Sequence, residues 1–331
     1  MKVFRLILLI LHLGIFLLLF GVLLNAYVPP KVFPWFNLLS LGFPVLMITY
    51  VLLTIFWLFC WKKRTFLFML LGLFFINPVK RWVNYSSEPK ETPNLKIISF
   101  NVKGGMYGPK EIEKYISDSQ ADIVLLQEYG WQKFQFEGLK RSDSTMSIVS
   151  LYSKYKVVGY KKLIAGDYES FNAYADQTDI EIKGKTYRFI NTYLQPFKFE
   201  KSMVKLNGDR DRDEQKLKNI LKRLIPTFKM HQEQVAMIRK GIDESPYPVI
   251  LTGDFNAVPN SYEYYHLSEG LEDAFFKVGR GSGTSFHDYK FPLRIDYIFT
   301  SKSIQPINYR VDRSVKLSDH YPVIADFNLN D

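Results

Sequence analysis

Two long apolar runs at the start of the chain constrain its architecture more than any other feature. Phe4–Val28 consists almost entirely of Leu, Ile, Phe and Val, and Trp35–Trp61 is a second such run with aromatic residues at both ends. At about 1.5 Å per residue in a helix, each run can cross a hydrocarbon core of about 30 Å. We therefore expect two retained membrane spans. A cleaved signal peptide is the weaker alternative, because the first run is long and a second one follows it.

A third apolar run, Thr65–Val79, has only 15 residues and is compatible with either crossing the membrane or lying at its surface. Lys2 and Arg5 precede the first run and Lys62–Arg64 follows the second, which places both positions in the cytoplasm by the positive-inside rule. If the third run also crosses, the chain after Lys80 lies outside the cytoplasm, and we favour this topology. With two crossings, that part of the chain is cytoplasmic.

The chain divides by composition into a membrane anchor, a linker and one folded domain. The predicted anchor is 1–81, with spans at about 4–28, 35–61 and 65–79; the polar linker is 82–94, and the domain is 95–331. Cys60 is the one cysteine, so an intrachain disulfide and a cysteine-based zinc site are both excluded.

The net charge of +10 is unevenly shared between the two parts of the chain. Six of the 43 basic residues and none of the 33 acidic residues lie in 1–79, which leaves 37 basic and 33 acidic residues, a charge of +4, for 80–331. The folded domain is therefore only mildly basic. It lacks the strong positive field of a tight, non-specific nucleic-acid binder, although a local basic groove stays compatible with this charge.

Short apolar runs alternate with charged, periodic segments in the domain. Such runs predict strands, here at Lys96–Val102, Ile123–Gln127, Met146–Ser153, Val157–Ile164, Thr178–Ile182, Tyr187–Leu194, Val249–Thr252, Tyr297–Thr300 and Val323–Asn328. Pro109–Ser119 predicts a helix, and Asp211–Lys240 predicts two helices divided by Pro226. This order predicts an α/β (α+β) fold in which mixed sheets are flanked by helices.

A polar residue stands at or near the end of several predicted strands. These residues are Asn101, Glu128, Asp254, Asn256, Asp296 and, within Ser318–Pro322, Asp319 and His320. A carboxylate or amide at a strand end is held on a rigid element at the rim of a sheet. Several of them together make an oxygen-rich site that suits Mg²⁺ or Mn²⁺, and such a site suits the cleavage of phosphate esters.

Six short motifs, in this order, resemble those of the endonuclease/exonuclease/phosphatase superfamily, also called the deoxyribonuclease-I-like or exonuclease-III-like fold. They are Ser99-Phe-Asn101, Leu126-Gln-Glu128, Asn191-Thr-Tyr-Leu194, Gly253-Asp-Phe-Asn256, Arg294-Ile-Asp-Tyr297 and Ser318-Asp-His320. Each is weak alone, but together they cover about Leu95 to Asn328 and make the assignment specific. The apolar spans resemble those of a membrane-anchored bacterial subgroup. The resemblance implies a four-layer α/β sandwich whose site lies where the two sheets splay.

The resemblance also implies roles at the metal and at the attacking water. Glu128 resembles the family's first metal ligand, Asn101 the amide that supports the metal, and Asp319 a second metal-site carboxylate. Asp254 resembles the residue that orients or deprotonates the water. Asn256 resembles the amide that contacts the scissile phosphate. The alternatives from the residues alone are turn roles: a helix-start Glu, a strand-ending Asn and an Asx-turn after Gly253.

His320 resembles the histidine that binds the phosphate and stabilises the transition state, and Asp296 the carboxylate that orients its imidazole and keeps it protonated. Tyr193 departs from many relatives, which have histidine there, and is similar to the exonuclease-III branch. A phenol is a poor acid at neutral pH, so it is expected to hydrogen-bond the phosphate or to serve only as a core residue. His231, His266 and His287 match no motif and are expected to have surface or helix-face roles.

These observations predict a membrane-anchored, metal-dependent phosphodiesterase, with a nuclease as the leading interpretation. A phospholipase-like or sphingomyelinase-like enzyme near the membrane is an alternative, and an inactive binding module is a third. The expected partners are a phosphodiester substrate, either nucleic acid or phospholipid, and the membrane; no protein partner is predicted. The expected location is the bacterial inner membrane, with the catalytic domain on the non-cytoplasmic side. The basic segment Phe197–Asp213 is either a substrate-contacting loop or a solvated surface.

Overall fold

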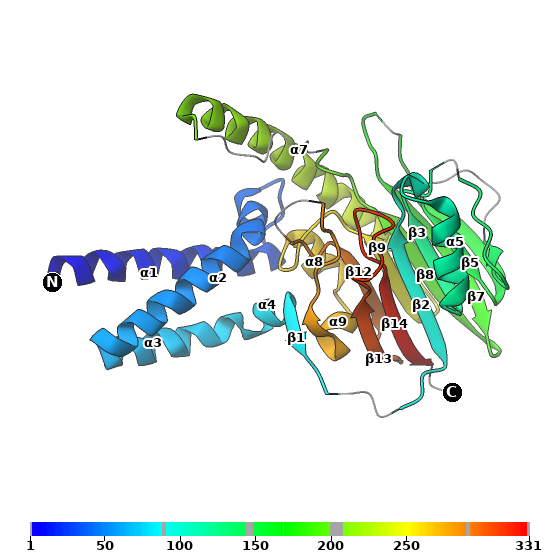
Figure 1. Ribbon diagram of the computed structural model, residues 1–331, viewed down its shortest axis with the longest axis horizontal. Coiled ribbons are helices and arrows are strands. Elements are labelled where there is room, and N and C mark those ends of the chain that lie inside the picture. Colours follow the sequence, from blue (N-terminus) through cyan, green and yellow to red (C-terminus); the bar gives the residue numbers. More distant parts are fainter. Residues whose placement is uncertain are drawn as a thin grey trace.

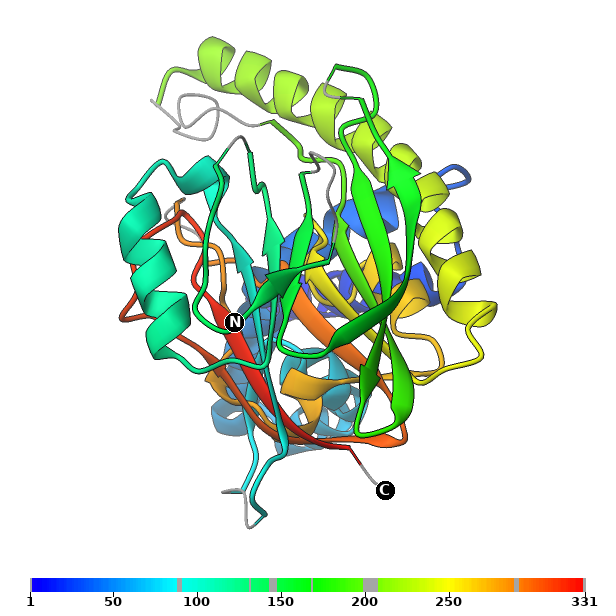
Figure 2. The same cartoon turned by 90° about the vertical axis from the view of Figure 1, so that its right-hand side faces the viewer.

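The computed structural model describes residues 2–87, 91–130, 132–142, 148–167, 169–198, 208–288 and 292–329. N-terminal helices extend from one side of a domain built on two β-sheets (Figure 1). The sheets face each other and carry helices on their outer faces, which gives the expected four layers of helix, sheet, sheet and helix (Figure 2).

The N-terminal part consists of helical segments that lie against one another. The helices are α1 (Lys2–Leu23), η1 (Leu24–Ala26), α2 (Trp35–Cys60), α3 (Lys62–Gly72), η2 (Leu73–Phe75) and α4 (Ile76–Lys80). Lys2–Ala26 and Trp35–Cys60 are long and apolar enough to be candidate membrane spans. The third apolar run is also helical, but it is broken into three short pieces. It returns toward the sheets, so the N-terminus and the α2–α3 turn both lie at the end far from the sheets (Figure 1).

Aromatic residues and one histidine fill the space between these helices. The Trp57 indole donates a hydrogen bond to Nδ1 of His12 at 3.1 Å, and the His12 ring stacks on Phe68 with ring centroids 3.5 Å apart. The Tyr50 hydroxyl donates to the carbonyl of Phe68 at 2.6 Å. These contacts join α1, α2 and α3 around a polar residue that is fully buried.

One sheet has the strand order β13-β14-β2-β3-β5-β4. Its strands are β2 (Leu95–Asn101), β3 (Ile123–Gln127), β4 (Lys140–Arg141), β5 (Ser150–Ser153), β13 (Ile304–Val311) and β14 (Val323–Leu329). β2 and β3 are parallel, and the other pairs are antiparallel. The central strands are apolar on both faces because one face meets the second sheet and the other meets α5 (Pro109–Asp118).

The second sheet has the order β10-β12-β9-β8-β7-β6. Its strands are β6 (Lys156–Ala165), β7 (Tyr174–Ile182), β8 (Lys185–Tyr193), β9 (Val249–Asp254), β10 (Leu271–Asp273) and β12 (Asp296–Ser301). β8 and β9 are the parallel pair in this sheet. A separate antiparallel pair joins β1 (Val83–Tyr85), in the segment predicted as a linker, to β11 (Arg280–Ser282).

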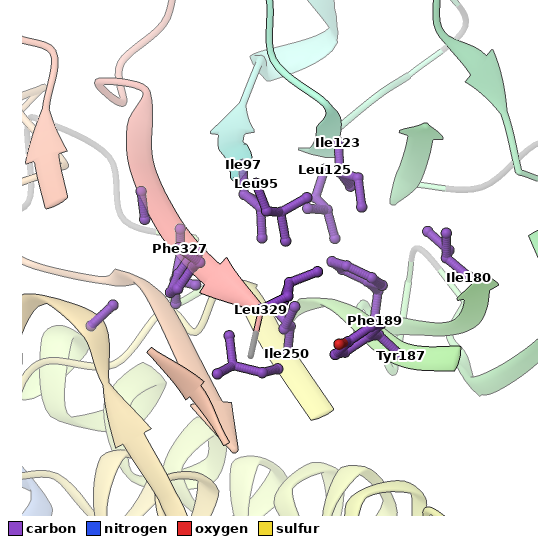
Figure 3. Packing of buried hydrophobic residues seen from close by; sticks show 14 of the residues in the cluster. Leu95, Ile97, Ile123, Leu125, Ile180, Tyr187, Phe189, Ile250, Phe327 and Leu329 are labelled. Carbon is purple, nitrogen blue, oxygen red and sulfur yellow. The ribbon is translucent and has the colours of Figure 1, made fainter. Parts of the chain in front are cut away.

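The main core lies between the two sheets (Figure 3). Ile97 and Leu125 project from one sheet, and Phe189 and Ile250 from the other; none of these side chains is exposed to solvent. Alternate residues of these strands face outward, toward the helices. The strand period of two therefore fixes which side chains enter the core and which ones meet the outer layers.

The outer layer on the second sheet is formed by α7 (Arg210–Asp243), α8 (Tyr262–Leu267) and α9 (Ala274–Val278). The prediction that Pro226 divides α7 was wrong, because α7 is continuous through it. The ring removes one backbone donor, but the second half of α7 is fixed by packing of Val235 and Ile238 on the sheet. In the first half of α7, Leu217 is 56% exposed.

The other strand predictions agree with the structure to within a few residues at their ends. The prediction for Met146–Ser153 is described only from residue 148 on, and β5 occupies Ser150–Ser153. Most of the basic segment Phe197–Asp213, namely 199–207, lies outside the described residues. β13 has no counterpart among the predicted strands, because its sequence alternates without a continuous apolar run.

The N-terminal helices also pack directly on the sheet domain. Ile15, Leu19 and Val22 of α1 belong to one buried cluster with Val258 and Phe286 of the domain. Polar groups are buried in the same contact: Asn25 donates to the carbonyl of Asn260, and Asn37 donates to both oxygens of Glu263 at 3.0 Å and accepts from the backbone of Tyr262. The helices are therefore packed on the domain and are not joined to it by the chain alone.

Candidate active site

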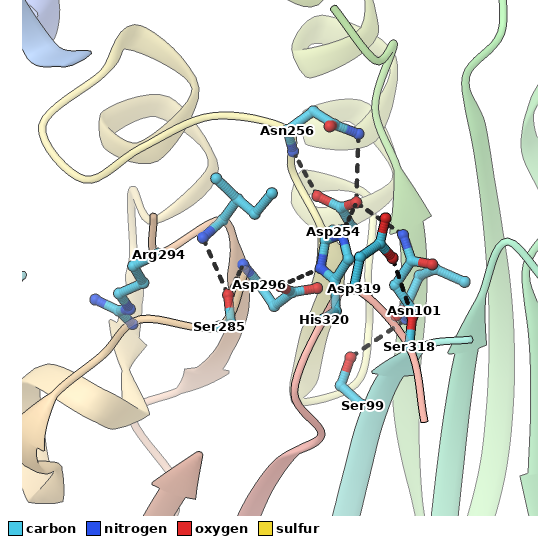
Figure 4. A network of polar contacts seen from close by, with 12 residues as sticks. Ser99, Asn101, Asp254, Asn256, Ser285, Arg294, Asp296, Ser318, Asp319 and His320 are labelled. Atoms are coloured by element: carbon cyan, nitrogen blue, oxygen red, sulfur yellow. Dashed lines mark hydrogen bonds and ion pairs between the residues drawn. The ribbon is translucent and has the colours of Figure 1, made fainter. Parts of the chain in front are cut away.

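The predicted site residues meet at one end of the two sheets because of strand direction. Asn101 ends β2 and pairs with Gln127, directly before Glu128. In the other sheet, Tyr193 ends β8 opposite Asp254, and Asp254 pairs with Asp296 at the start of β12. Parallel neighbours end at the same edge of a sheet, so the residues that follow them converge. Figure 4 shows the resulting polar network.

Two of these residues have an unusual backbone conformation. Glu128 has φ of 46° and Asn256 has φ of 44°, in the left-handed region that non-glycine residues adopt rarely. Each is the first or second residue after a buried strand. Strained backbone of this kind persists where the surrounding structure holds it, and it is concentrated at functional sites.

The amide of Asn101 connects the two sheets across the site. Its Nδ2 donates to Oε1 of Glu128 at 3.0 Å and to Oδ2 of Asp254 at 3.0 Å, and its Oδ1 accepts from the backbone of Lys103 at 3.1 Å. Asn101 is fully buried and Glu128 is half-buried. The two carboxylates therefore have fixed positions on either side of one amide.

His320 is fixed between two carboxylates. Its Nδ1 lies 2.8 Å from Oδ2 of Asp296, and its Nε2 lies 3.7 Å from Oδ2 of Asp254. Burial disfavours the charged ring, but Asp296 and Asp254 outweigh it and raise the pKa of His320 to about 10. The ring is thus an imidazolium at neutral pH, and Phe286 packs against it edge-on.

Asp254 lies where several negative groups gather. Burial raises its pKa to about 8, the charges of Asp296 and Glu128 act in the same direction, and His320 opposes them. The backbone N–H of Asn256 donates to Oδ1 of Asp254 at 2.8 Å, and the Asn256 side chain donates to the carbonyl of Leu194 at 2.9 Å. Asp254, Asp296 and His320 offer ligand atoms within 4.8 Å of one another.

Asp319 forms an ion pair that the sequence did not predict. Its Oδ2 lies 2.5 Å from Nζ of Lys103. Burial alone would raise the pKa of Asp319, but His320 and Lys103 hold it below its usual value. Lys103 itself has φ of 45° and lies in η3 (Lys103–Gly105), two residues after Asn101. A lysine in the turn directly after the strand-ending Asn101 was the available signal for this contact.

The hydroxyl of Tyr193 lies against Glu128 inside the site. Burial, followed by the charges of Glu128 and Asp254, raises the pKa of Tyr193 well above its ordinary value. Below Tyr193, the side chain of Gln127 donates to Oδ1 of Asn191 at 2.7 Å, and Asn191 donates to the carbonyl of Leu126. This second polar layer, which was also not predicted as such, joins β3 to β8 beneath the site.

Of the three histidines without a motif, His231 has a helix-face role and does not lie at the surface. It lies on the inner face of α7, fully buried, with Nδ1 2.7 Å from Oε1 of Glu263 and Nε2 2.7 Å from the carbonyl of Gln195. His266 is half-buried on α8, and His287 stacks on Tyr321 beside the site. A buried Glu–His contact between two helices leaves no local sequence signal.

A comparison with family models adds the evidence that decides the family. Residues 98–320 match the model of the Endonuclease/Exonuclease/phosphatase family. The chain belongs to this family. Residues 5–82 match a second model, described as a domain of unknown function. Comparison with curated proteins gave no match.

Solved structures of the family share the fold of this domain. The family protein from Leptotrichia buccalis is 17% identical over 71% of this chain and 100% of its own, with a TM-score of 0.51. The family protein from Bacteroides vulgatus is 20% identical over 72% of this chain and 100% of its own, also with 0.51. The human Nocturnin catalytic domain, with bound sulfate, is 17% identical over 72% of this chain and 95% of its own, with a TM-score of 0.50.

Members of the family hydrolyse phosphate esters, so this chain is a phosphoester hydrolase. Family enzymes use divalent metal ions, and the residues present fit such an ion. Glu128, Asn101 and Asp319 offer oxygen atoms, the ligands that Mg²⁺ and Mn²⁺ prefer. Burial raises the pKa of Asp254 most, the negative charges of Asp296 and Glu128 add to it, and a bound cation would relieve that charge.

Proposed function

We propose that this chain is a membrane-anchored, metal-dependent phosphodiesterase that hydrolyses its substrate by in-line attack of water. The observation that carries the proposal is the placement of Asn101, Glu128, Asp254 and the Asp296–His320 pair around one point where the two sheets end. Such a cluster combines a base, a cation and oxygen ligands in a buried setting.

Glu128, with Asn101 and Asp319, would hold Mg²⁺ or Mn²⁺, which would neutralise negative charge on the substrate oxygens. Asp254 orients the attacking water and accepts its proton. A high pKa favours proton acceptance once the group is ionised, and the nearby His320 favours the ionised form. Asn256 follows on the same turn and contacts the phosphate.

His320 supplies the fixed positive charge of the site. Because Nδ1 is bound to Asp296, Nε2 is the ring nitrogen that can donate to a non-bridging phosphate oxygen. Tyr193 keeps its proton, since its pKa is raised well above the ordinary value, and it contributes a hydrogen bond. A phenol with so high a pKa is a poor donor of a full proton to the leaving group.

We also propose that the N-terminal helices span the membrane and that the catalytic domain lies on the non-cytoplasmic side. Lys2 and Arg5 of α1 lie at the end far from the sheets, as does the α2–α3 turn, which Lys62–Arg64 follows (Figure 1). With these positive groups in the cytoplasm, the domain at the other end is exported. The third apolar segment then crosses as α3, η2 and α4 together.

A nucleic acid is the first substrate class to test, and a phospholipid is the second. The loop after β9 favours the second, because it carries Asn256 at its start and contacts Asn25 of the membrane helices through Asn260. The mild charge of the domain also fits a substrate that is brought close by the membrane and not by a wide basic surface.

The experiment is hydrolysis by the full chain in detergent with Mg²⁺ or Mn²⁺, on plasmid DNA, abasic duplex, RNA, phospholipid vesicles and bis-p-nitrophenyl phosphate. We expect activity that a chelator abolishes and that Glu128→Ala lacks. Affinity that weakens steeply with salt identifies a nucleic acid, whereas activity on vesicles that is insensitive to salt identifies a lipid. Full activity of Glu128→Ala would contradict the proposed site.

A further inference from the structure

A cavity of about 290 Å³ lies on the domain side of the N-terminal helices, away from the site residues. It is formed where α4 meets α8, β10 and α9, and Asn77, Arg81, Ser268 and Lys277 are among its lining residues. Arg81 directly follows the end of α4 at Lys80. In the anchored arrangement proposed above, on which this inference rests, that position is the level of the lipid headgroups.

The cation Arg81 lines this cavity, and the cation Lys80 lies beside it, over the ring of the lining residue Phe276. Nη1 of Arg81 donates to Oδ1 of Asn260 at 2.9 Å, and its guanidinium lies 4.7 Å and 4.6 Å from the ring centroids of Tyr264 and Tyr265. Nζ of Lys80 lies 4.9 Å from the ring centroid of Phe276. Arg81 uses one nitrogen in the bond to Asn260, and its guanidinium lies over two rings. Its remaining N–H groups are available to a phosphate.

The carboxylates in the cavity wall are already neutralised by other residues. Asp273 accepts two hydrogen bonds from the buried guanidinium of Arg294, at 2.8 Å and 2.6 Å, and one from the Tyr264 hydroxyl. Glu272 pairs with Lys277 at 2.9 Å. Within the described part of the chain, neither Lys80 nor Arg81 forms an ion pair. The cavity therefore carries an uncompensated positive charge.

An apolar surface leads along the third segment to these cations. Leu73, Phe74 and Ile76, in the last two turns before Lys80, are 57%, 59% and 51% exposed. An exposed apolar helix surface that ends at fixed cations, aromatic rings and amide and hydroxyl groups matches the two halves of a phospholipid.

We propose that this cavity binds the headgroup of an anionic glycerophospholipid. The phosphate contacts Arg81 and Lys80, Asn77 and Ser268 contact the polar part of the headgroup, and the acyl chains lie along η2 and α4. The bound lipid fixes the height of the domain above the membrane. It also lies next to Asn260, in the same loop as the proposed catalytic residue Asn256.

The test uses the full chain in a non-ionic detergent and measures thermal stabilisation during titration with dioctanoylphosphatidylglycerol, dioctanoylphosphatidylcholine, glycerol 3-phosphate or inorganic phosphate. The variants are Arg81→Gln and Lys80→Gln; the second leaves the contact between Arg81 and Asn260 intact. Lys302→Gln, an exposed lysine in the turn between β12 and β13, is the matched control. Hydrolysis of bis-p-nitrophenyl phosphate and resistance of membrane association to alkaline carbonate are measured on the same preparations.

We expect phosphatidylglycerol to stabilise the wild type more than phosphatidylcholine, and each variant to bind it at least about tenfold more weakly, while the control is unchanged. Equal stabilisation by the two lipids, or unchanged binding in both variants, would overturn the proposal. If inorganic phosphate binds as tightly as phosphatidylglycerol, the cavity binds phosphate in general, and the proposal that it binds a lipid is wrong. Thermal stabilisation measures lipid binding without any need for catalysis. A failure of lipid binding is therefore distinguishable from a failure of hydrolysis or of membrane anchoring.

Discussion

The molecule contains two buried carboxylate–histidine pairs of nearly equal geometry in two different regions. Glu263 and His231 lie 2.7 Å apart where the N-terminal helices meet the domain, and Asp296 and His320 lie 2.8 Å apart in the candidate active site. All four side chains are at most 4% exposed. The two pairs differ in what surrounds them, and this difference separates a structural pair from one suited to catalysis.

Glu263 and His231, the interface pair, have their hydrogen bonds satisfied by groups of the protein itself. The oxygens of Glu263 accept from His231 and from Asn37, and the second ring nitrogen of His231 donates to the carbonyl of Gln195. Burial alone would raise the pKa of Glu263, but His231 and Asn37 hold it below its usual value. Nothing is left at this pair for a ligand to bind.

The active-site pair is incomplete. Oδ1 of Asp296 is buried and has no hydrogen-bond partner among the described residues, and Nε2 of His320 is only within 3.7 Å of Asp254. Negative charge is in excess there, which contributes to the raised pKa of Asp254. A buried pair with an unfilled donor position and excess charge of one sign is suited to a charged substrate and a cation.

The largest expected effect is on catalysis by the active-site pair. We expect His320→Asn to reduce kcat/KM by about 10³-fold or more, because it removes the charge aimed at the phosphate. His231→Asn should lower thermal stability, with activity per folded molecule within a few-fold of wild type. The measurements are steady-state hydrolysis and thermal unfolding of the same full-length proteins, with His266→Asn as the control. Equal losses of activity in the two variants would remove the distinction.

The second effect is on stability at the interface. Glu263→Gln removes the buried carboxylate that pairs with His231 and accepts from Asn37, and breaking a buried pair in this way costs about 3–5 kcal/mol. Glu233→Gln breaks the exposed Lys31–Glu233 pair at the same interface and should cost at most about 1 kcal/mol. Denaturant unfolding of the full chain measures both values. Similar values for the two variants would show that burial does not set the strength of this contact.

The third effect is a shift in pH dependence. The ring charge of His320 is lost as the pH rises through its folded pKa of about 10, whereas the ordinary value is 6.5. Stabilisation from this charge is therefore complete below about pH 6.5 and disappears on the alkaline side. Asp296→Asn lowers the pKa of His320, so the alkaline limb of kcat/KM should move to lower pH. Glu263→Gln should leave that limb in place, and an unmoved limb in Asp296→Asn would contradict the pairing.

The smallest effect concerns the phenol in the site. Tyr193→Phe keeps the ring and removes one hydrogen bond, so we expect kcat/KM to fall by about tenfold or less. Tyr264→Phe removes a buried hydroxyl that donates to Asp273, away from the site, and should leave kcat/KM unchanged. A loss of several thousandfold in Tyr193→Phe would make Tyr193 a proton donor and not a supporting contact.

The same comparison explains how far the sequence could predict this molecule. The convergence of the candidate site residues could be predicted because most of them lie at or next to the end of an apolar strand, and parallel neighbours such as β2 and β3 bring their ends together. The interface pair could not, because Glu263 and His231 come from two helices and are brought together only by tertiary packing. The continuity of α7 through Pro226 was missed for the same reason, since packing outweighs local propensity.

The most direct test of the proposed active site is Mn²⁺-dependent hydrolysis of bis-p-nitrophenyl phosphate by four full-length proteins: wild type, Glu128→Gln, His320→Asn and His231→Asn. We expect metal-dependent activity in wild type and in folded His231→Asn, and activity at the level of the chelated control in the other two. Metal-dependent activity retained by Glu128→Gln and His320→Asn would contradict the proposed active site, because the reaction would then occur at a different site.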